Sequence, residues 1–412
     1  MTDSTIPILT RTSLFAMLLA VFAVSAGYGI VLPILPFLID QFADQNGSAS
    51  IGSHTGLLMG IYVLAVFLFA PLWGAISDRR GRKPVMLAGL SGFAVTVFVL
   101  AKAESLPVLY VGRFLSGAFS AAITPAAFAL IGDHAPDLAW RAHRFALVNI
   151  AGSLGFFIGP MIGGLAVRSS AAFAGGTAET APSAPFVAAA ALATVAAAVV
   201  LLSLPSATPS RTEDPPAETP NANKGAIYRL PAIAFATAYA VGSFEVGLSL
   251  QGKMLGLDAA HIGAMFAECS LVMAVVQAAI FSPLFKPGIT RWFIAPGLAV
   301  LLVGLAGFSL VETDGAMAVA IGLIAGSAGI LSPIATYWAS LGPAIHQGKN
   351  LGRMTASSSL GQAVGSAAAG LLFSGEGLSV GGFVLPVLVV TSAFLMSLHL
   401  PRILVAHTPE RP

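Results

Sequence analysis

The chain has 412 residues, of which 56% are hydrophobic and only 9% are charged, and it contains 44 glycines. A water-soluble globule cannot hide so much apolar surface, so the composition excludes a soluble protein and indicates a membrane protein. The formal net charge of +2 is too small for a general attraction to nucleic acid, and we expect no such partner. The single cysteine, Cys269, cannot form an internal disulfide, and its apolar surroundings predict a buried, inert thiol.

Apolar runs separated by short polar breaks recur along the chain. We predict that each run forms a membrane-spanning helix, because lipid offers backbone groups no other hydrogen-bond partner. In the first run, the small residues from Val24 to Ala26 resemble a signal-peptide cleavage site. The apolar run continues far enough beyond them to span the membrane, so we expect this segment to stay attached. The twelve predicted spans are 13–38, 55–76, 84–102, 107–131, 145–167, 184–204, 228–250, 260–283, 292–311, 315–340, 351–374 and 380–401. Hydropathy supports the Gly- and Ala-rich run 351–374 least.

Lys and Arg are unevenly distributed over the loops that join these spans. If the N-terminus is cytoplasmic, the outer loops hold only Lys102, Arg168 and Lys253, and the inner segments hold most of the other basic residues. Because basic loops are retained on the cytoplasmic side, we expect a multi-pass protein of the cell inner membrane with both termini in the cytoplasm.

One segment, 205–226, differs from the rest because it is rich in Pro, Thr and Glu and nearly devoid of large apolar residues. This composition predicts a flexible linker on the cytoplasmic side. Six predicted spans precede it and six follow, so we expect an N-terminal bundle over 1–204 and a C-terminal bundle over 227–412. Two equal halves are typical of duplicated transporter architectures.

The loop between the second and third spans concentrates charge that the rest of the chain avoids. Its glycines and charged residues resemble the signature loop of the major facilitator superfamily, Gly-x-Leu-x-Asp-Arg-x-Gly-Arg-Arg/Lys, with Ile76 in place of the usual Leu. The matching residues are Gly74, Asp78, Arg79, Gly81, Arg82 and Lys83. We expect Gly74 to permit close helix approach and Gly81 to permit a turn that a Cβ would resist.

This resemblance implies the major facilitator fold: an all-α membrane protein with twelve spans in two pseudo-symmetric six-helix bundles. It also implies that Asp78 and its basic neighbours form a latch that closes the cytoplasmic side in one state. Charges are tolerable at the water interface, where they can bias a two-state equilibrium. The alternative interpretation is a set of ordinary basic anchors, which would not require Asp78 and both glycines at these offsets.

The fourth span carries an arginine within an apolar run, in "LYVGRFLSGAFSAA", residues 109–122. An arginine in hydrocarbon is costly, so we expect Arg113 to face the protein interior, and the alternative is that it snorkels to the surface. The stretch resembles a superfamily pattern in which the matching arginine is implicated in proton coupling.

The fifth span contains "GSLGFFIGPMIGG", residues 152–164, which resembles the superfamily's antiporter motif Gly-x(3)-Gly-Pro-x(2)-Gly-Gly. The matching residues are Gly155, Gly159, Pro160, Gly163 and Gly164. Glycines four residues apart create a groove for close packing, and the proline promotes a bend. The residues alone predict only a tight packing face, whereas the resemblance implies transport out of the cell.

The first span adds "GYGIVLPILP", residues 27–36, which looks like the opening helix of the twelve-span drug:proton antiporter branch. Tetracycline-type exporters of that branch have an acidic residue shortly before this stretch. The corresponding segment here, Ala23 to Ala26, has none, which argues against a tetracycline-specific site.

Two acidic residues, Glu245 and Glu268, lie within apolar spans of the second half. An apolar environment disfavours the charged carboxylate, so such residues are candidates to take up and release a proton. Glu245 is the first choice, because acidic residues recur in the seventh span of the drug-exporter branch. The alternatives are that Glu245 is hydrated or paired with Lys253 near the outer surface, and that Glu268 binds a cationic substrate or hydrogen-bonds a neighbouring helix.

Polar and aromatic side chains within the spans are candidates for the wall of a central substrate cavity. They suit an amphipathic or cationic organic molecule, although most such aromatics pack against other helices or sit at the membrane interface. The candidates are Tyr28, Asn149, Phe156, Tyr239, Gln277, Tyr337, Trp338 and Gln362.

Together these features predict a monomeric transporter in the lipid bilayer that exports a small organic molecule, either a drug-like compound or a metabolite such as a siderophore, in exchange for protons. Because the sequence shows no nucleotide-phosphate loop, metal cluster or hydrolytic signature, we expect no enzymatic activity, cofactor or metal. The alternatives are a proton-coupled importer or facilitator of a small nutrient and a non-transporting membrane sensor.

Overall fold

The computed structural model describes residues 9–41, 48–134, 138–174, 183–205, 224–280, 287–310, 314–340, 347–373 and 381–405. All regular structure in these ranges is helical, as the all-α prediction requires. Residues 206–223 of the predicted linker, 205–226, lie outside the described residues, and its last three residues, 224–226, begin a helix.

Eight helices of the first half are described, and they are α1 (Arg11–Val31), α2 (Leu35–Asp40), α3 (Ser48–Arg80), α4 (Arg82–Leu100), α5 (Leu106–Ser120), α6 (Ile123–Asp133), α7 (Leu138–Ala174) and α8 (Ala184–Ser203). Those described in the second half are α9 (Lys224–Met254), α10 (Ala259–Ile280), the 3₁₀ helix η2 (Pro287–Phe293), α11 (Ile294–Leu310), α12 (Asp314–Ser340), α13 (Gln347–Leu372), α14 (Gly381–Ser397) and α15 (Leu400–Val405).

Each of the twelve predicted spans contains helix, but some are interrupted. The first span divides into α1 and α2 around Pro33, and the fourth divides into α5 and α6 at Ala121 and Ala122. Proline has no backbone N–H, so Pro33 cannot bond the carbonyl of Gly29, and Pro125 cannot bond the carbonyl of Ala121. Hydropathy could not reveal these breaks, because it averages over the whole apolar run.

Ten helices in the described ranges are long and apolar enough to cross a membrane. The two remaining predicted spans fall on α13, which is 26 residues long but rich in Gly, Ala and Ser, and on α14, which has 17 residues. The low apolarity of α13 agrees with the weak signal expected for residues 351–374.

The chain forms two compact units that interleave in sequence. The first unit comprises residues 1–42, 64–212 and 257–267, and the second comprises 43–63, 213–256 and 268–412. The first part of α3 therefore belongs to the second unit, and the first part of α10 belongs to the first unit.

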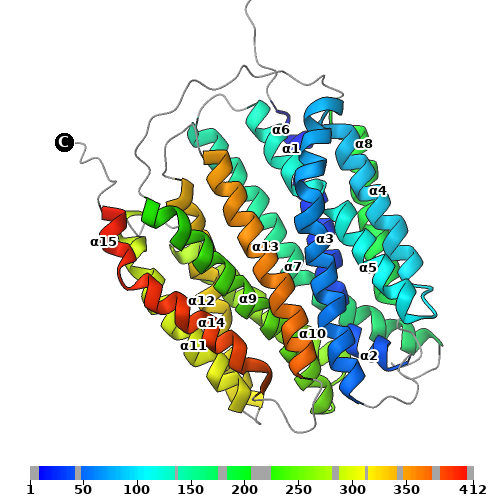
Figure 1. Ribbon diagram of the computed structural model, residues 1–412. Coiled ribbons are helices and arrows are strands. Elements are labelled where there is room, and N and C mark those ends of the chain that lie inside the picture. The colour runs from blue at the N-terminus through cyan, green and yellow to red at the C-terminus, as the bar shows by residue number, and fades with distance from the viewer. Residues whose placement is uncertain are drawn as a thin grey trace, which may run out of the picture. The chain divides into compact units, whose positions relative to one another are not determined.

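Within the second unit, α9 and α13 lie side by side, in green and orange in Figure 1, and their backbones approach closely. A Cβ atom at Gly242 would lie 2.5 Å from the carbonyl oxygen of Gln362, and one at Gly361 or Gly365 would overlap the carbonyl oxygen of Phe235 or Tyr239. Lipid is as apolar as leucine, so close packing of small residues replaces the hydrophobic effect as the force that joins these helices.

This contact predicts that Gly365→Ala lowers the free energy of unfolding by about 1–3 kcal/mol, because the added methyl group must push the helices apart. The matched control is Gly322→Ala in α12, where no described heavy atom lies within 4 Å of the new Cβ. The control should be neutral or stabilising by up to about 1 kcal/mol, through helix propensity. Unfolding of purified protein in detergent checks both values, and equal destabilisation by the two variants would contradict this account of the contact.

Candidate functional site

The charged loop of the sequence is a tight turn between α3 and α4, made by Gly81. Its φ of +93° is in the left-handed region that side chains avoid, and its N–H donates to the carbonyl of Ser77 at 3.0 Å. The expected role of Gly81 in a turn is therefore confirmed. The expectation for Gly74 was wrong, because no described heavy atom lies within 4 Å of a Cβ built there.

Arg82 joins two carboxylates from different helices at this turn. Its guanidinium donates to Asp78 at the end of α3, and its Nε donates to Oδ2 of Asp133 at the end of α6, at 2.9 Å. A further bond runs from Nη1 to the hydroxyl of Ser77 at 3.1 Å. A planar guanidinium with several donors suits such a shared site better than an ammonium would.

The other cations of the loop differ in their surroundings. The Nζ atom of Lys83 donates to the carbonyl of Leu204 at 2.6 Å, and Leu204 caps the C-terminus of α8. A cation there satisfies a free terminal carbonyl and interacts favourably with the helix dipole. The side chain of Arg79 is exposed.

Arg113 in α5 is turned into the interior of the first unit. Only 2% of it is exposed, and its guanidinium carbon lies 5.6 Å from the ring centre of Tyr28 in α1. Tyr28 in turn stacks on Phe156 of α7, with ring centres 5.9 Å apart. A cation–π contact of this kind accommodates a charge away from water, so the expectation that Arg113 faces inward is confirmed and snorkelling is excluded.

The glycines of α7 form a close contact with α1. Cβ atoms at Gly155, Gly159 and Gly163 would each lie 2.5 Å from a carbonyl oxygen of α1. The fourth glycine, Gly164, lies against α10, where a Cβ would be 2.7 Å from the Cα of Ala260. The helix continues through Pro160 without interruption. These positions show the packing face that the residues predict.

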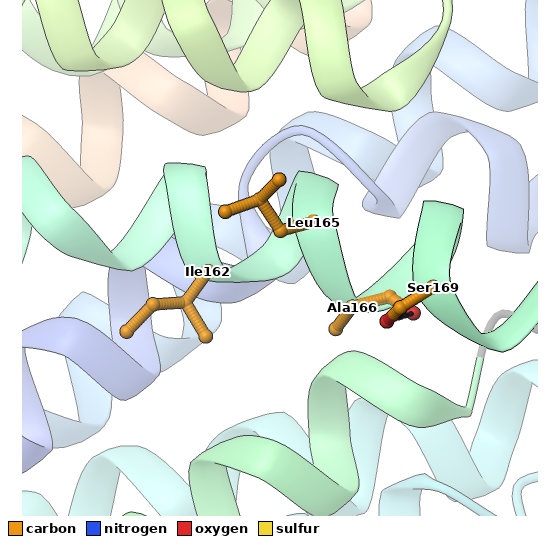
Figure 2. A pocket seen from close by; sticks show the side chains of 4 residues that line it. All are labelled: Ile162, Leu165, Ala166 and Ser169. Atoms are coloured by element: carbon orange, nitrogen blue, oxygen red, sulfur yellow. Dashed lines mark hydrogen bonds between the residues drawn. The ribbon is translucent and has the colours of Figure 1, made fainter.

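A pocket of about 580 Å³ opens beside the same helix (Figure 2). Its described lining consists of Ile162, Leu165, Ala166 and Ser169, which follow one stripe of α7. The stripe carries no ionisable group, so it suits an apolar group and cannot exchange a proton. None of the predicted cavity residues belongs to this lining.

Glu245 lies in α9 inside the second unit, with 2% of its surface exposed. The side-chain nitrogen of Gln362, in α13, donates to both of its carboxylate oxygens, at 3.1 and 3.2 Å. The tertiary structure thus pairs a predicted proton-coupling residue with a predicted cavity residue. A buried carboxylate without donors would be far more costly.

Glu268 lies in α10 and is partly exposed, unlike Glu245. Both carboxylates are close enough to the thiol of Cys269 to interact with it electrostatically, and Cys269 is buried as expected.

The remaining cavity candidates have varied surroundings. Asn149 is exposed, Gln277 is partly exposed, and Tyr239 is buried beside Phe235. The indole nitrogen of Trp338 donates to Thr290 at 3.0 Å, and the Tyr337 ring meets that of Trp338 edge to face. Tyr28, Asn149 and Phe156 belong to the first unit, and the others belong to the second.

Comparison with known proteins identifies the family. Residues 17–366 match the Major Facilitator Superfamily. The chain belongs to this superfamily.

Several curated relatives are resistance proteins. The class D tetracycline resistance protein of Salmonella ordonez is 29% identical over 376 residues, which cover 87% of this chain and 89% of that protein. The class C protein of Escherichia coli is 38% identical over 144 residues, or 34% of each chain. The quinolone resistance protein NorA of Staphylococcus aureus is 28% identical over 157 residues, covering 38% of this chain and 39% of that one. The alignments with the class C, class H and class E tetracycline resistance proteins span only 34% to 38% of the length of those proteins.

Solved structures support the same fold. A bacterial homologue of the human lysosomal transporter Spinster, inward-facing and unoccupied, superposes with a TM-score of 0.75 at 14% identity, over 97% of this chain and 98% of that one. The human organic anion transporter MFSD10 (TETRAN) gives 0.69 at 21% identity, over 94% and 99%. The predicted major facilitator fold is confirmed, and superfamily membership identifies the chain as a membrane transport protein rather than an enzyme.

Sequence reasoning on the superfamily loop missed Asp133. It is the acidic residue at the end of the fourth predicted span, and that span and the loop both end at the same expected membrane edge. An acidic residue at the same membrane edge as the cations of the loop is the signal that could have identified Asp133 as their partner. Only the packing of α6 beside α4 shows that it reaches Arg82.

We expect Asp133→Asn to loosen the α3–α4 turn more than Asp78→Asn does. The side chain of Asp133 is 31% exposed and that of Asp78 is 67% exposed, so water screens the first pair less. The loss should be about 1 kcal/mol or less, because the site is open to solvent. Hydrogen exchange at the Gly81 amide measures it, with Glu104→Gln, an exposed acid outside the turn, as the control. A difference that persists at about 1 M salt would contradict an ionic origin.

Proposed function

We propose that this chain exports an amphipathic or cationic small organic molecule in exchange for protons, by alternating access within the major facilitator fold. The observation that carries the proposal is Glu245, a carboxylate with 2% exposure in a helix long and apolar enough to span the membrane. An ionisable group at such a position is costly and is retained chiefly where it has a function.

The names of the relatives support export of drug-like compounds. Tetracycline and quinolone resistance proteins are among them, with identities of 28% to 38% over the aligned residues. The absence of an acidic residue from Ala23 to Ala26 favours a substrate other than tetracycline within this group. A metabolite such as a siderophore is the second class of substrate that we propose to test.

The proton step uses the two intramembrane acids of the second unit, Glu245 and Glu268. A proton from outside neutralises Glu245 or Glu268, which lowers the cost of keeping that group away from water and favours the transition towards the inward-facing state. Release of the proton inside restores the charge and resets the cycle. An arginine side chain stays protonated in proteins, so we propose for Arg113 an electrostatic part in the coupling rather than proton exchange.

The orientation and the assembly belong to the same proposal. We place both termini in the cytoplasm of a cell with this protein in its inner membrane, and we propose that the working form is a monomer that contains both substrate and proton sites. The turn at Gly81 then lies on the cytoplasmic side, where Arg82 and its two carboxylates act as the latch.

The second candidate function is a proton-coupled importer or facilitator of a small nutrient. It uses the same two intramembrane acids but predicts accumulation of the substrate inside the cell. The resemblance of residues 155–164 to the antiporter motif favours export over this alternative.

The proposal predicts substrate-dependent proton release from reconstituted vesicles. The protein is screened with cationic dyes, antibiotics and siderophores, and proton counterflow is measured together with substrate movement. We expect Glu245→Gln to abolish counterflow, because an amide cannot exchange a proton, and Glu268→Gln to reduce it. Glu104→Gln, which removes an exposed acid outside the spans, serves as the matched control and should behave like the unmodified protein.

Movement of a substrate without proton flux in the unmodified protein would eliminate antiport and leave a facilitator. Proton flux in the same direction as the substrate would favour the importer.

A further inference from the structure

In the second unit, α13 is held between two other helical segments. One is α9, whose backbone contacts α13 at Gly361 and Gly365. The other is the first part of α3, residues 48–63, which belongs to the same unit. A shift of α13 away from either neighbour must therefore change its contact with the other.

At its glycines, the contact between α3 and α13 brings the two backbones close together. A Cβ at Gly60 would lie 2.7 Å from the carbonyl oxygen of Ala363, and a Cβ at Gly370 would lie 2.5 Å from that of Gly52. A Cβ at Gly56 would overlap the carbonyl oxygen of Ser366. The glycines have no side chain to fill a gap, so such a contact forms only while α13 stays in register, since dispersion attraction falls steeply with distance.

Polar side chains hold α13 in that register from the α9 side. The hydroxyl of Ser366 donates to the carbonyl of Gly242 at 3.3 Å, and that of Ser243 donates to the carbonyl of Gly365 at 3.0 Å. About one turn further along α13, Gln362 donates to Glu245, and this is the bond of the three whose acceptor can change its charge. Gln362 also directly precedes Ala363, which contacts α3.

We propose that Gln362 is a positioning residue that couples the charge of Glu245 to the contact between α13 and the first part of α3. The charged carboxylate holds the amide and keeps α13 in register. A hydrogen bond to a charged acceptor is roughly twice as strong as one to a neutral acceptor, so protonation weakens this hold and loosens α13 from α3. The inference rests on the proposed role of Glu245 as a proton-exchanging acid. It adds that Gln362 links protonation of Glu245 to the movement of α13.

Other titratable groups occur on the helices around Glu245. The described ones on α9, α10, α12, α13 and the first part of α3 are Tyr228, Arg229, Tyr239, Lys253, His261, Glu268, Cys269, Tyr337, Arg353, His54 and Tyr62, and the described parts of α11 and α14 contain none. Cys269 interacts electrostatically with Glu245. His54 lies on the α3 segment itself, so the test must separate its effect from that of Glu245.

Hydrogen exchange of the full chain in lipid nanodiscs, without substrate, tests the coupling between pH 5.5 and 8.5. After correction for the chemistry of exchange, we expect residues 51–63 and 354–372 to exchange about fivefold faster at the acidic end, as loss of one charge-assisted hydrogen bond predicts. Glu245→Gln and Gln362→Met should both exchange fast and without pH dependence, although His54 remains in each. Thr391→Val, which removes a hydroxyl that bonds within α14, is the matched control and should keep the original profile.

The exchanged pair, Glu245→Gln with Gln362→Glu, gives the sharpest test. It restores one carboxylate and one amide at the same place, so we expect the pH dependence to return, which a merely structural role of Gln362 would not produce. If Gln362→Met fails to fold, as judged by size-exclusion chromatography, Gln362→Asn replaces it, because its shorter side chain keeps the amide but withdraws it from Glu245.

Proton counterflow in the same variants separates the two proposals. If Glu245→Gln abolishes counterflow while Gln362→Met keeps the pH-dependent exchange of the unmodified protein, the coupling through Gln362 is overturned and the proposed function stands. If the unmodified protein shows no pH-dependent exchange and Glu245→Gln leaves counterflow intact, both are overturned.

Discussion

The membrane interior offers no water to a backbone N–H or C=O, and the rest of this structure depends on that constraint. Backbone groups inside the spans must bond within their own helix, so the described residues form helices wherever the chain is apolar. Lipid also removes the hydrophobic force between helices, which leaves close packing to join them. The glycines of α7 and α13 supply it, since their neighbours' carbonyl oxygens occupy the space of a Cβ.

The same constraint decides how charges are accommodated. At the α3–α4 turn, Arg82 pairs with two carboxylates that are partly open to water. Such exposed ion pairs can form and break with little change in free energy. Inside the spans, Arg113 lies over the face of Tyr28, and Glu245 accepts bonds from Gln362. A buried charge is tolerated only with such compensation, so any change in its protonation alters the packing around it. This property makes an intramembrane acid suitable for coupling a proton to a conformational change.

The residues predicted to bind substrate are more widely distributed than the charged residues. The predicted cavity residues are distributed over both units, and several are engaged in packing, as Trp338 is with Thr290 and Tyr28 is with Phe156. The described pocket beside α7 has an apolar lining. Membership of the Major Facilitator Superfamily defines the fold and the transport class, whereas the substrate depends on the individual side chains that line the cavity.

The sequence by itself determined the class of protein, the approximate spans, the turn at Gly81 and the burial of Arg113, because apolar runs, glycine geometry and the cost of charge in lipid are local properties. Only the tertiary structure decided that Asp133 joins Arg82, that Gln362 reaches Glu245 and that Gly74 contacts no neighbouring helix in the described chain. Each of these outcomes depends on how a helix is rotated and how far it slides along its neighbour. Rotation and register follow from the packing of many small residues at once, and no single stretch of sequence specifies them.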